Sequence, residues 1–381
     1  MGVERHLHIV SFNIPLPADY GGVIDVFYRI KALYAQGVKI HLHCFLYGRQ
    51  PVAELHRYCV EVCYYKRSMS GWLLFSSKPF IVVSRRNKQL VHRIMQDDYP
   101  VLIEGLHCCA TLETLRQSEC QSTRPQRTIL VRMHNVEHDY YYALGRATKK
   151  TFYRLYLMLE AFKLRRYESV LSKATALLAV SNQDLRYFVN LNYTKSILLP
   201  SSHANDKLTS RAGQGSYALY HGDLSVPENV QAVDWLLTNV FSNGRHRLRV
   251  AGRNPDSELA RHIAKMPNVE LISSPNRDAM QHLISEAQVV VMVTAQPTGL
   301  KLKLLNSLYA SRFCLVNSNM VAGTPLGSLC VVADTPEAMR DSLDELMSRP
   351  FTESEIERRR QLLGQYYDVR HNAEVLIDLF L

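Results

Sequence analysis

The chain has 381 residues, with 45 Lys and Arg against 35 Asp and Glu, which gives a formal net charge of +10. This length exceeds one ordinary hydrophobic core, so two domains are expected. The charge allows an anionic partner, whether a membrane surface, a nucleic acid or a phosphorylated ligand, and does not choose among them. No apolar run reaches the roughly 20 residues of a membrane-spanning helix, and the first residues lack the pattern of a signal peptide. We therefore expect a cytoplasmic location.

The eight cysteines contain no C-x-x-C pair, which favours reduced thiols over a zinc or redox site.

The first half of the chain alternates strands with helices. Alternating or continuous apolar runs predict strands, and apolar residues three or four apart predict helices. A strand over 6–14 leads through a loop with the Gly21-Gly22 pair to a helix over 24–37. Further strands are expected over 38–48, 100–107, 128–138 and 175–184, the last ending in an Asn or Asp cap and another helix, with a long helix over 149–172.

The second half repeats this alternation after a polar stretch. Residues 199–216, LPSSHANDKLTSRAGQGS, have the turn-rich composition of a linker. The elements expected after it are strands over 217–224, 246–253, 268–274, 288–295 and 313–318, helices over 229–240, 257–265, 277–287 and 300–310, and a helical tail from about 353.

Two such halves predict an α/β protein with two doubly wound, Rossmann-like domains facing a central cleft. The expected domains are 1–198 and 217–365, joined by the linker 199–216 and followed by a C-terminal segment, 366–381. Ligands of such sheets bind beyond the carboxyl ends of the strands. The polar loops of this chain all follow strands, so they are expected to form the binding site.

Six segments, in their order and spacing, resemble the GT-B glycosyltransferases, specifically the retaining "glycosyl transferases group 1" or family 4 type. They are PLPADYGGVIDVFY, VRMHNVEHDYY, LLAVSNQD, YHGDLSVPENVQAVDWL, RVAGRNP and TGLKLKLLNSLYASRFCLVN. The resemblance implies that the first domain binds an acceptor and the second a nucleotide-diphosphate sugar. It also implies that 366–381 packs back on the first domain, and that domain closure assembles the site.

The run VTAQPTGLKLK is expected to form the diphosphate site of the donor. Backbone N–H groups at a helix start favour an anion, and Lys303 adds a mobile point charge that can neutralise the leaving nucleotide. The structural alternative for these lysines is a side chain that reaches solvent from an amphipathic helix. This alternative suits Lys301 better than Lys303. Arg253 could contact an anion, but it could equally be a solvated loop residue. The resemblance implies these donor-binding residues: Gly22, His221, Gly222, Arg253, Gly299, Leu300, Lys301, Lys303 and Asn306.

A cluster of polar residues lies at the end of the strand expected over 128–138. A lone histidine is more often structural, but His134 has Asn135, Glu137 and His138 beside it. The resemblance implies that His134 contacts the donor sugar, and Glu137 could bind sugar or acceptor hydroxyls. A helix cap or an ion pair with Arg is the structural alternative for Glu137.

The resemblance also places the acceptor near the first loop and this cluster. The residues implied are Tyr20, Gly21 and Asn135. From the residues alone, the glycine pair could equally be a tight turn.

Three departures from the family pattern concern the donor site. Asn306 stands where the family usually has a Glu that binds the ribose hydroxyls, and Asn keeps one acceptor and two donors. The segment HGDLSVPENV lacks the Arg and Lys that clasp the diphosphate, and the loop QPTGL lacks the first carboxylate of the family's Glu pair. No D-x-D metal motif is present, so no cofactor or metal is expected, with a helix dipole and basic residues taking the place of an ion.

The stretch 149–173 carries seven Lys or Arg among aromatic and aliphatic residues. A long helix with one buried and one solvated basic face is one interpretation. The other is an interfacial helix drawn to anionic lipid at the inner face of the plasma membrane, with YYKRSMSGWLLFSSKPF adding to that surface. No nucleic-acid-binding module is recognisable.

The predicted function is transfer of a hexose from a nucleotide-diphosphate sugar to a glycan or lipid-linked acceptor in surface polysaccharide synthesis. Retention of configuration follows from the resemblance only. The alternative is a catalytically impaired GT-B protein that binds sugar nucleotides or serves as a partner subunit. A dinucleotide-dependent oxidoreductase is disfavoured, because the first βα loop is not G-x-G-x-x-G.

Overall fold

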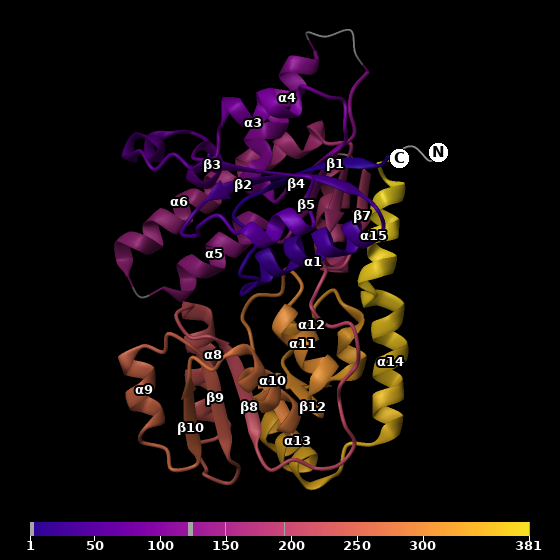
Figure 1. The fold of residues 1–381 in the computed structure, drawn as a ribbon. Helices are drawn as coiled ribbons and strands as arrows, with labels where there is room; N and C mark the ends of the chain where they lie inside the picture. Colours follow the sequence, from indigo (N-terminus) through magenta and orange to yellow (C-terminus); the bar gives the residue numbers. More distant parts are fainter. Residues whose placement is uncertain (1–3, 121–124, 149, 194, 381) are drawn as a thin grey trace. The chain divides into compact units, whose positions relative to one another are not determined.

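The computed structural model describes residues 4–120, 125–148, 150–193 and 195–380 (Figure 1). Lys149, the first residue of the predicted basic stretch, and Leu381, the last residue of the C-terminal segment, lie outside the described residues. The chain forms two compact units. The first unit comprises Met1–Tyr142, Leu155–Ala204 and Tyr367–Leu381, and the second comprises Ala143–Arg154 and Asn205–Tyr366.

Each unit is built on one parallel sheet. The first sheet has the strand order β3-β2-β1-β4-β5-β6-β7, and the second has the order β10-β9-β8-β11-β12-β13. The strands of the first are β1 (His6–Ser11), β2 (Lys39–Leu46), β3 (Glu61–Lys66), β4 (Val101–Glu104), β5 (Ile129–Met133), β6 (Ala176–Ala179) and β7 (Lys195–Leu198). Those of the second are β8 (Ala218–Asp223), β9 (Leu248–Arg253), β10 (Val269–Ser273), β11 (Val289–Met292), β12 (Phe313–Val316) and β13 (Val331–Val332).

Helices connect these strands. The central strands, such as β4 and β11, are buried along their whole length, as expected where helices cover both faces of a parallel sheet. The helices are α1 (Gly21–Ala35), α2 (Phe80–Val83), α3 (Lys88–Ile94), α4 (Cys109–Glu119), α5 (Glu137–Ala147), α6 (Thr151–Tyr167), α7 (Asn182–Leu191), α8 (Pro227–Asn239), α9 (Ser257–Ile263), α10 (Arg277–Glu286), α11 (Leu302–Ala310), α12 (Ser318–Val321), α13 (Pro336–Ser348), α14 (Glu353–Tyr367) and α15 (Val369–Asp378).

The prediction of two doubly wound, Rossmann-like sheets is confirmed by these strand orders. Chain order reverses between β1 and β4 in the first sheet and between β8 and β11 in the second. Ligands of such sheets bind at these switch points, beyond the carboxyl ends of the strands. The two switch points are therefore where functional residues are to be sought.

Several local predictions need correction. Gly21 and Gly22 begin α1 and do not form a loop, and the cap before α7 is Ser181. The C-terminal tail is two helices, α14 and α15, and the side chain of Asp368 caps the start of the second. Within the first unit, α15 then packs on α1, and Gln36 donates a hydrogen bond to Glu374.

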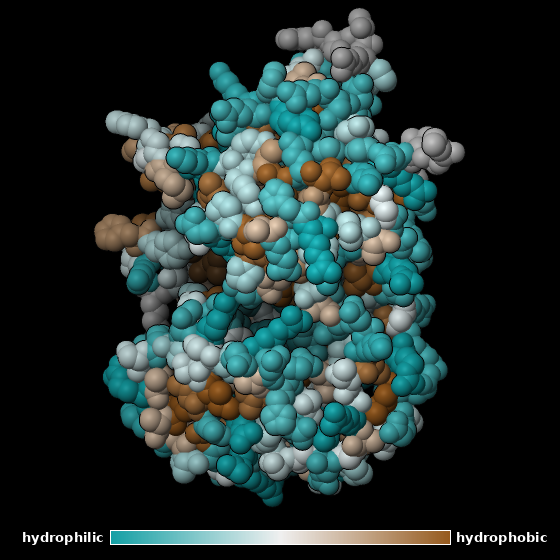
Figure 2. All heavy atoms as spheres, in the orientation of Figure 1, coloured by the Kyte–Doolittle hydropathy of each residue, from teal (hydrophilic) through white to brown (hydrophobic). Residues whose placement is uncertain are grey.

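No helix within the described ranges has both the length and the apolar character needed to cross a bilayer. On the face seen in Figure 2, hydrophilic residues predominate, and apolar side chains protrude at the left edge, level with α6.

A cluster of buried ions joins α1, β4 and β5 inside the first unit. Arg29 contacts Asp25 at 2.5 Å (Nη2–Oδ2) and Glu104 at 2.7 Å (Nη1–Oε1), and Arg132 contacts Asp25 at 3.1 Å (Nη2–Oδ2). All four side chains are buried. Two carboxylates thus balance two guanidinium groups, which is the condition under which buried charges are tolerated.

The same cluster fixes the chain after β7. The backbone N–H of Ser202 donates to Asp25 (2.7 Å), and Arg132 donates to the carbonyl oxygen of Leu199. Burial alone would raise the pKa of Asp25, but Arg132 and Arg29 outweigh it and hold that pKa well below its usual value. Asp25 is therefore ionised at any ordinary pH.

Asp25→Asn should destabilise the first unit strongly, because it leaves two buried guanidinium groups with a single carboxylate. Breaking a buried ion pair by removing one partner costs about 3–5 kcal/mol. The matched control, Asp19→Asn, removes a more exposed pair with Arg49, which should cost less than about 1 kcal/mol. Urea unfolding followed by circular dichroism measures both. Equal losses in the two variants would contradict the importance of the cluster.

Candidate functional site

Most residues predicted to bind the donor lie at the switch point of the second unit. His221 and Gly222 belong to β8, and Lys303 and Asn306 belong to α11, which follows β11. Gly299, Leu300 and Lys301 lie in the loop before α11. The structure thus brings these residues to the edge between β8 and β11.

The loop between β11 and α11 is fixed at both ends. Asn317 accepts a hydrogen bond from the N–H of Thr294 (3.1 Å) and donates to its carbonyl (2.8 Å). Gly299 has φ +73°, in the left-handed region that favours glycine, and turns the chain into α11. Among the described residues no side chain caps this helix at Lys301. The backbone N–H groups of its first turn can therefore meet an anion.

Lys303 is held by the protein, whereas the sequence predicted a mobile charge. Its Nζ lies 3.0 Å from Asn229 Oδ1 and 3.4 Å from the Tyr220 hydroxyl. Burial lowers the pKa of Lys303 to about 8, and the nearby Glu228 only partly opposes that effect. Its partners within hydrogen-bond distance are neutral. A bound anion would stabilise the ammonium form and raise this pKa.

The other lysine has a different role. Lys301 donates through Nζ to the carbonyl of Thr298, within its own loop. This bond ties the side chain to the turn before α11. A contact to a bound phosphate remains a prediction for this residue.

His221 links β8 to α11 within the second unit. Its Nε2 lies 2.9 Å from the Ser307 hydroxyl, and burial lowers its pKa to about 3 with help from the Lys303 charge. The imidazole is therefore neutral at physiological pH. A Cβ at the neighbouring Gly222 would lie 3.4 Å from the side chain of Asn229, which accepts a hydrogen bond from Lys303.

Arg253 ends β9 and lies beside a carboxylate. Its Nη2 is 3.2 Å from Asp223 Oδ2, and the guanidinium is exposed. Such an exposed pair is weak, so Arg253 remains able to exchange Asp223 for a ligand anion.

The departures from the family pattern have structural counterparts here. Asn306 Oδ1 accepts a hydrogen bond from Asn205 (2.8 Å), so one of the two lone pairs open to a ribose hydroxyl is already used. In place of the missing Arg and Lys, the first turn of α8 carries Glu228, which accepts from the Thr294 hydroxyl, and Asn229, which accepts from Lys303. One lysine, one carboxylate and neutral groups thus stand where the family carries cations.

The first acceptor-binding candidates follow β1 at the switch point of the first unit. Tyr20 precedes α1, accepts a hydrogen bond from Asn13 (3.3 Å), and has the Arg49 guanidinium 5.0 Å from its ring centre. A Cβ at Gly22 would lie 2.7 Å from Phe12 Cζ. This close approach explains the glycine structurally, and donor contact at Gly22 remains a prediction.

His134 follows β5 and lies between two carboxylates. Its Nε2 is 2.9 Å from Glu104 Oε2, and its Nδ1 is 3.4 Å from Asp25 Oδ2. Both ring nitrogens thus face the ion cluster, which fixes the ring. Asn135 is the next residue and is half-buried. Their roles toward sugar and acceptor stay predictions.

Glu137 is the first residue of α5, and its side chain is buried. Burial, together with the charge of Glu168, raises the pKa of Glu137 to about 8. Its nearest basic group is His107, with Nδ1 3.8 Å from Glu137 Oε1. A buried carboxyl group with a pKa near neutrality is typical of functional sites.

Two side chains at this edge were not predicted. The ring of His107 lies 5.4 Å from that of Phe12, and Arg85 donates to the Phe12 carbonyl (3.1 Å) from a buried position. His107 lies three residues after the end of β4, a strand-end position like that of His134. Arg85 has no comparable signal, because only tertiary packing buries it.

Glu137→Gln should change how stability depends on pH. The folded pKa of about 8 lies above the ordinary value of 4.5, so stability from the protonated group is fully present below pH 4.5 and is lost as pH rises through 8. The Gln variant should match the wild type at low pH and exceed it at pH 9 by up to a few kcal/mol, since one pKa unit is about 1.4 kcal/mol. Thermal midpoints across this range test it.

The control for this experiment is Glu54→Gln, which neutralises an exposed carboxylate of the same unit. Parallel pH profiles for the wild type and Glu137→Gln would show that Glu137 titrates normally.

Comparison with known proteins places the fold. No protein-family model matches the chain. An uncharacterized 44.6 kDa protein in the cps region of Klebsiella pneumoniae is 25% identical over 358 residues, covering 86% of this chain and 87% of that protein.

Three solved structures are similar over nearly their whole length. A glycosyltransferase of Rickettsia africae has a TM-score of 0.66 at 12% identity, covering 99% of this chain and 98% of that one. A UDP-forming trehalose-phosphate synthase of Burkholderia xenovorans with glucose-6-phosphate has 0.63 at 11%, covering 99% and 100%. The HepE protein of Anabaena with UDP and glucose has 0.62 at 9%, covering 99% of both. The predicted GT-B fold is thereby confirmed, and the group 1 assignment stays a prediction.

Proposed function

We propose that this protein is a glycosyltransferase that moves a hexose from a nucleotide-diphosphate sugar to a glycan or lipid-linked acceptor, with retention of configuration. The second unit binds the donor and the first unit binds the acceptor. The product belongs to surface polysaccharide synthesis at the inner face of the plasma membrane.

The start of α11 carries this proposal. Gly299 turns the chain so that the first-turn N–H groups of α11 and the Lys303 amine lie at the switch point of the second sheet. An uncapped helix start and a cation with neutral partners favour a diphosphate. The charge that develops on the leaving nucleotide is stabilised by these groups, so the proposed reaction needs no metal ion.

The comparisons support the same class of substrate. The HepE structure holds UDP and glucose, and the Burkholderia xenovorans structure holds glucose-6-phosphate. The Klebsiella pneumoniae relative belongs to a cps region, which fits polysaccharide synthesis. These are properties of those proteins, and we extend them to this chain as part of the proposal.

The first unit supplies groups for the sugar and the acceptor. Glycosyl transfer passes through a cationic, oxocarbenium-like sugar. In the proposed mechanism His134, fixed by Glu104 and Asp25, contacts the donor sugar, and Glu137 holds a hydroxyl or its proton at the reacting centre. Tyr20, Gly21 and Asn135 orient the acceptor.

A catalytically impaired sugar-nucleotide binder or partner subunit is the second candidate function. The engaged Asn306 and the carboxylate of Glu228, next to where the family carries cations, favour it. A donor site with one lysine in place of several cations binds a diphosphate more weakly.

Nucleotide binding separates the two candidates. We expect one of UDP, GDP, ADP and CMP, or a sugar conjugate of it, to raise the thermal midpoint by several degrees, since ligand at 100 Kd adds about 2.7 kcal/mol to stability. Labelled donor then tests transfer to glycan and lipid-linked acceptors. No shift with any of them, from folded protein, would reject the transferase. A shift without transfer would favour the binder.

Lys303→Met should weaken nucleotide binding by about 1.5–3 kcal/mol, the scale of a hydrogen bond to a charged group. The matched control is Lys265→Met, at an exposed lysine of the same unit, which should bind as the wild type does. Isothermal calorimetry measures both. Equal affinity in the two variants would remove Lys303 from the donor site.

The pH dependence gives a second test of Lys303. Its pKa of about 8 means that part of the population must take up a proton when the diphosphate binds. Affinity should therefore fall as pH rises from 7 to 9. Calorimetry in buffers of different ionisation enthalpy should detect proton uptake that is absent in Lys303→Met. Uptake that persists in the variant would assign it to another group.

A further inference from the structure

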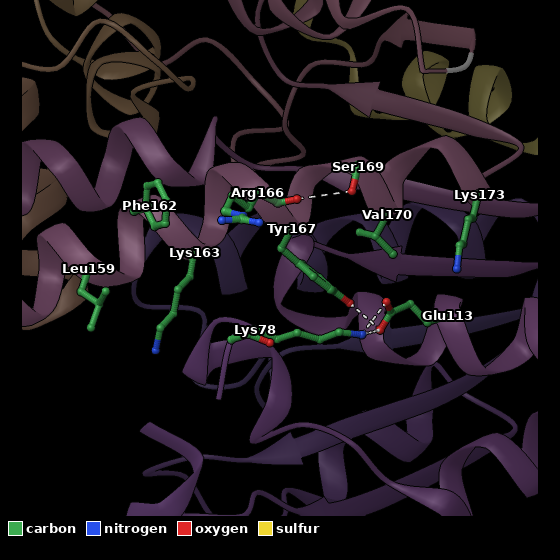
Figure 3. A pocket seen from close by; sticks show the side chains of 11 residues that line it. Lys78, Glu113, Leu159, Phe162, Lys163, Arg166, Tyr167, Ser169, Val170 and Lys173 are labelled. Carbon is green, nitrogen blue, oxygen red and sulfur yellow. Dashed lines mark hydrogen bonds and ion pairs between the residues drawn. The ribbon is translucent and has the colours of Figure 1, made fainter. Parts of the chain in front are cut away.

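A basic cavity of about 510 Å³ opens on the first unit, and it shares no lining residue with the candidate site (Figure 3). It lies between α6, α4, the 3₁₀ helix Glu168–Lys173 and the segment after residue 76. Its charged lining consists of four cations and one carboxylate: Lys78, Lys163, Arg166, Lys173 and Glu113. The cavity wall therefore has an excess of three positive charges.

Two of these cations are neutralised within the protein. Lys78 contacts both oxygens of Glu113 (2.8 and 2.9 Å), and Lys163 contacts Glu160 (3.0 Å) and the carbonyl of Leu74 (2.9 Å).

The other two cations face solvent. Arg166 and Lys173 are exposed, and no carboxylate of the described residues lies within ion-pair distance of either. The excess charge thus resides on side chains that can reach an external anion.

Large apolar side chains project beside this cavity. Trp72 and Phe75 are 83% and 84% exposed, and Leu159 and Phe162 on α6 are more than half exposed. The bond from Lys163 to the carbonyl of Leu74 holds the 3₁₀ helix Gly71–Phe75 against α6. Clustered exposed aromatic residues of this kind mark interaction surfaces.

We propose that this surface, the α6 patch (Trp72, Phe75, Leu159, Phe162, Arg166 and Lys173), docks on an anionic membrane. Arg166 and Lys173 bind lipid phosphate groups at the cavity, while the apolar side chains enter the boundary between headgroups and acyl chains. Basic residues flanking exposed aromatic and aliphatic ones are the composition of interfacial membrane-binding surfaces.

The charges argue against a second copy of this chain as the partner. A two-fold interface through the same patch would bring Arg166 and Lys173 close to their own copies, and like charges across an interface are unfavourable. Leu159 and Phe162, on an exposed helical face, suit acyl chains better than nucleic-acid bases. The inference rests on this patch alone, so it does not depend on the proposed reaction.

Vesicle sedimentation tests the proposal directly. The full chain should pellet with vesicles of phosphatidylcholine mixed with phosphatidylglycerol and remain in solution with phosphatidylcholine alone. Added salt should release it from the vesicles that contain phosphatidylglycerol. Removing two interfacial cations should weaken binding about thirtyfold, the equivalent of about 1 kcal/mol each. The double variant Arg166→Ala, Lys173→Ala should show this loss. The control is the double variant Lys265→Ala, Arg277→Ala, which makes an equal charge change on exposed residues of the second unit and should bind as the wild type does.

Fluorescence tests the apolar contact. The chain has two tryptophans, so Trp235→Phe leaves Trp72 as the only tryptophan, whose emission can be excited selectively. Its emission should shift to shorter wavelength with anionic vesicles and stay unchanged with neutral ones. Trp72→Ser with Phe75→Ser, both at exposed positions, should reduce pelleting while the thermal midpoint stays the same.

Several results would overturn the proposal. They are equal pelleting with both vesicle types, equal loss in the two double charge variants, an unchanged Trp72 spectrum in pelleted protein, and stabilisation by inorganic phosphate without any vesicle binding. A dimer that Trp72→Ser with Phe75→Ser dissociates would also overturn it, by assigning the patch to a second copy.

Discussion

The first unit depends on one balanced group of buried charges. Asp25 and Glu104 bind Arg29 and Arg132, and these four residues come from α1, β4 and β5. The cluster also binds the backbone at Ser202 and faces both nitrogens of His134. A buried ion is tolerated only with its partners in place, so the cluster ties α1, β4 and β5 together beside the proposed acceptor site.

The second unit uses a buried charge differently. Lys303 has hydrogen-bonding partners that are neutral, Asn229 and Tyr220, and its lowered pKa records the cost of desolvation. Glu137 in the first unit bears a similar cost through its raised pKa. A protein tolerates such costs where a ligand or a reaction requires them. Both groups lie at predicted ligand edges, which is the physical basis of the proposed function.

The α6 patch adds a third surface, separate in its residues from both edges. A transferase with a lipid-linked acceptor must work where its substrate is anchored. An interfacial patch would hold the first unit near that substrate, and its affinity would be set by ionic strength and lipid charge. The patch would also serve a non-catalytic member of the fold, since neither Lys303 nor Glu137 takes part in it.

Apolar periodicity and turn composition are local properties, so the sequence was enough to predict the alternation of strands and helices, the two doubly wound sheets, and the residues at strand ends. It also identified His134, Glu137 and Lys303 as residues of interest. It missed β3, β7, β13 and the helices α2, α3, α4, α5, α12 and α13, and it misplaced the start of α1. The tertiary fold sets which polar side chains meet: Asp25 with Arg132, Lys303 with Asn229, and Asn306 with Asn205. These pairs are 74 or more residues apart in the sequence, so their pairing, burial and pKa shifts arise from packing and leave no local pattern to read.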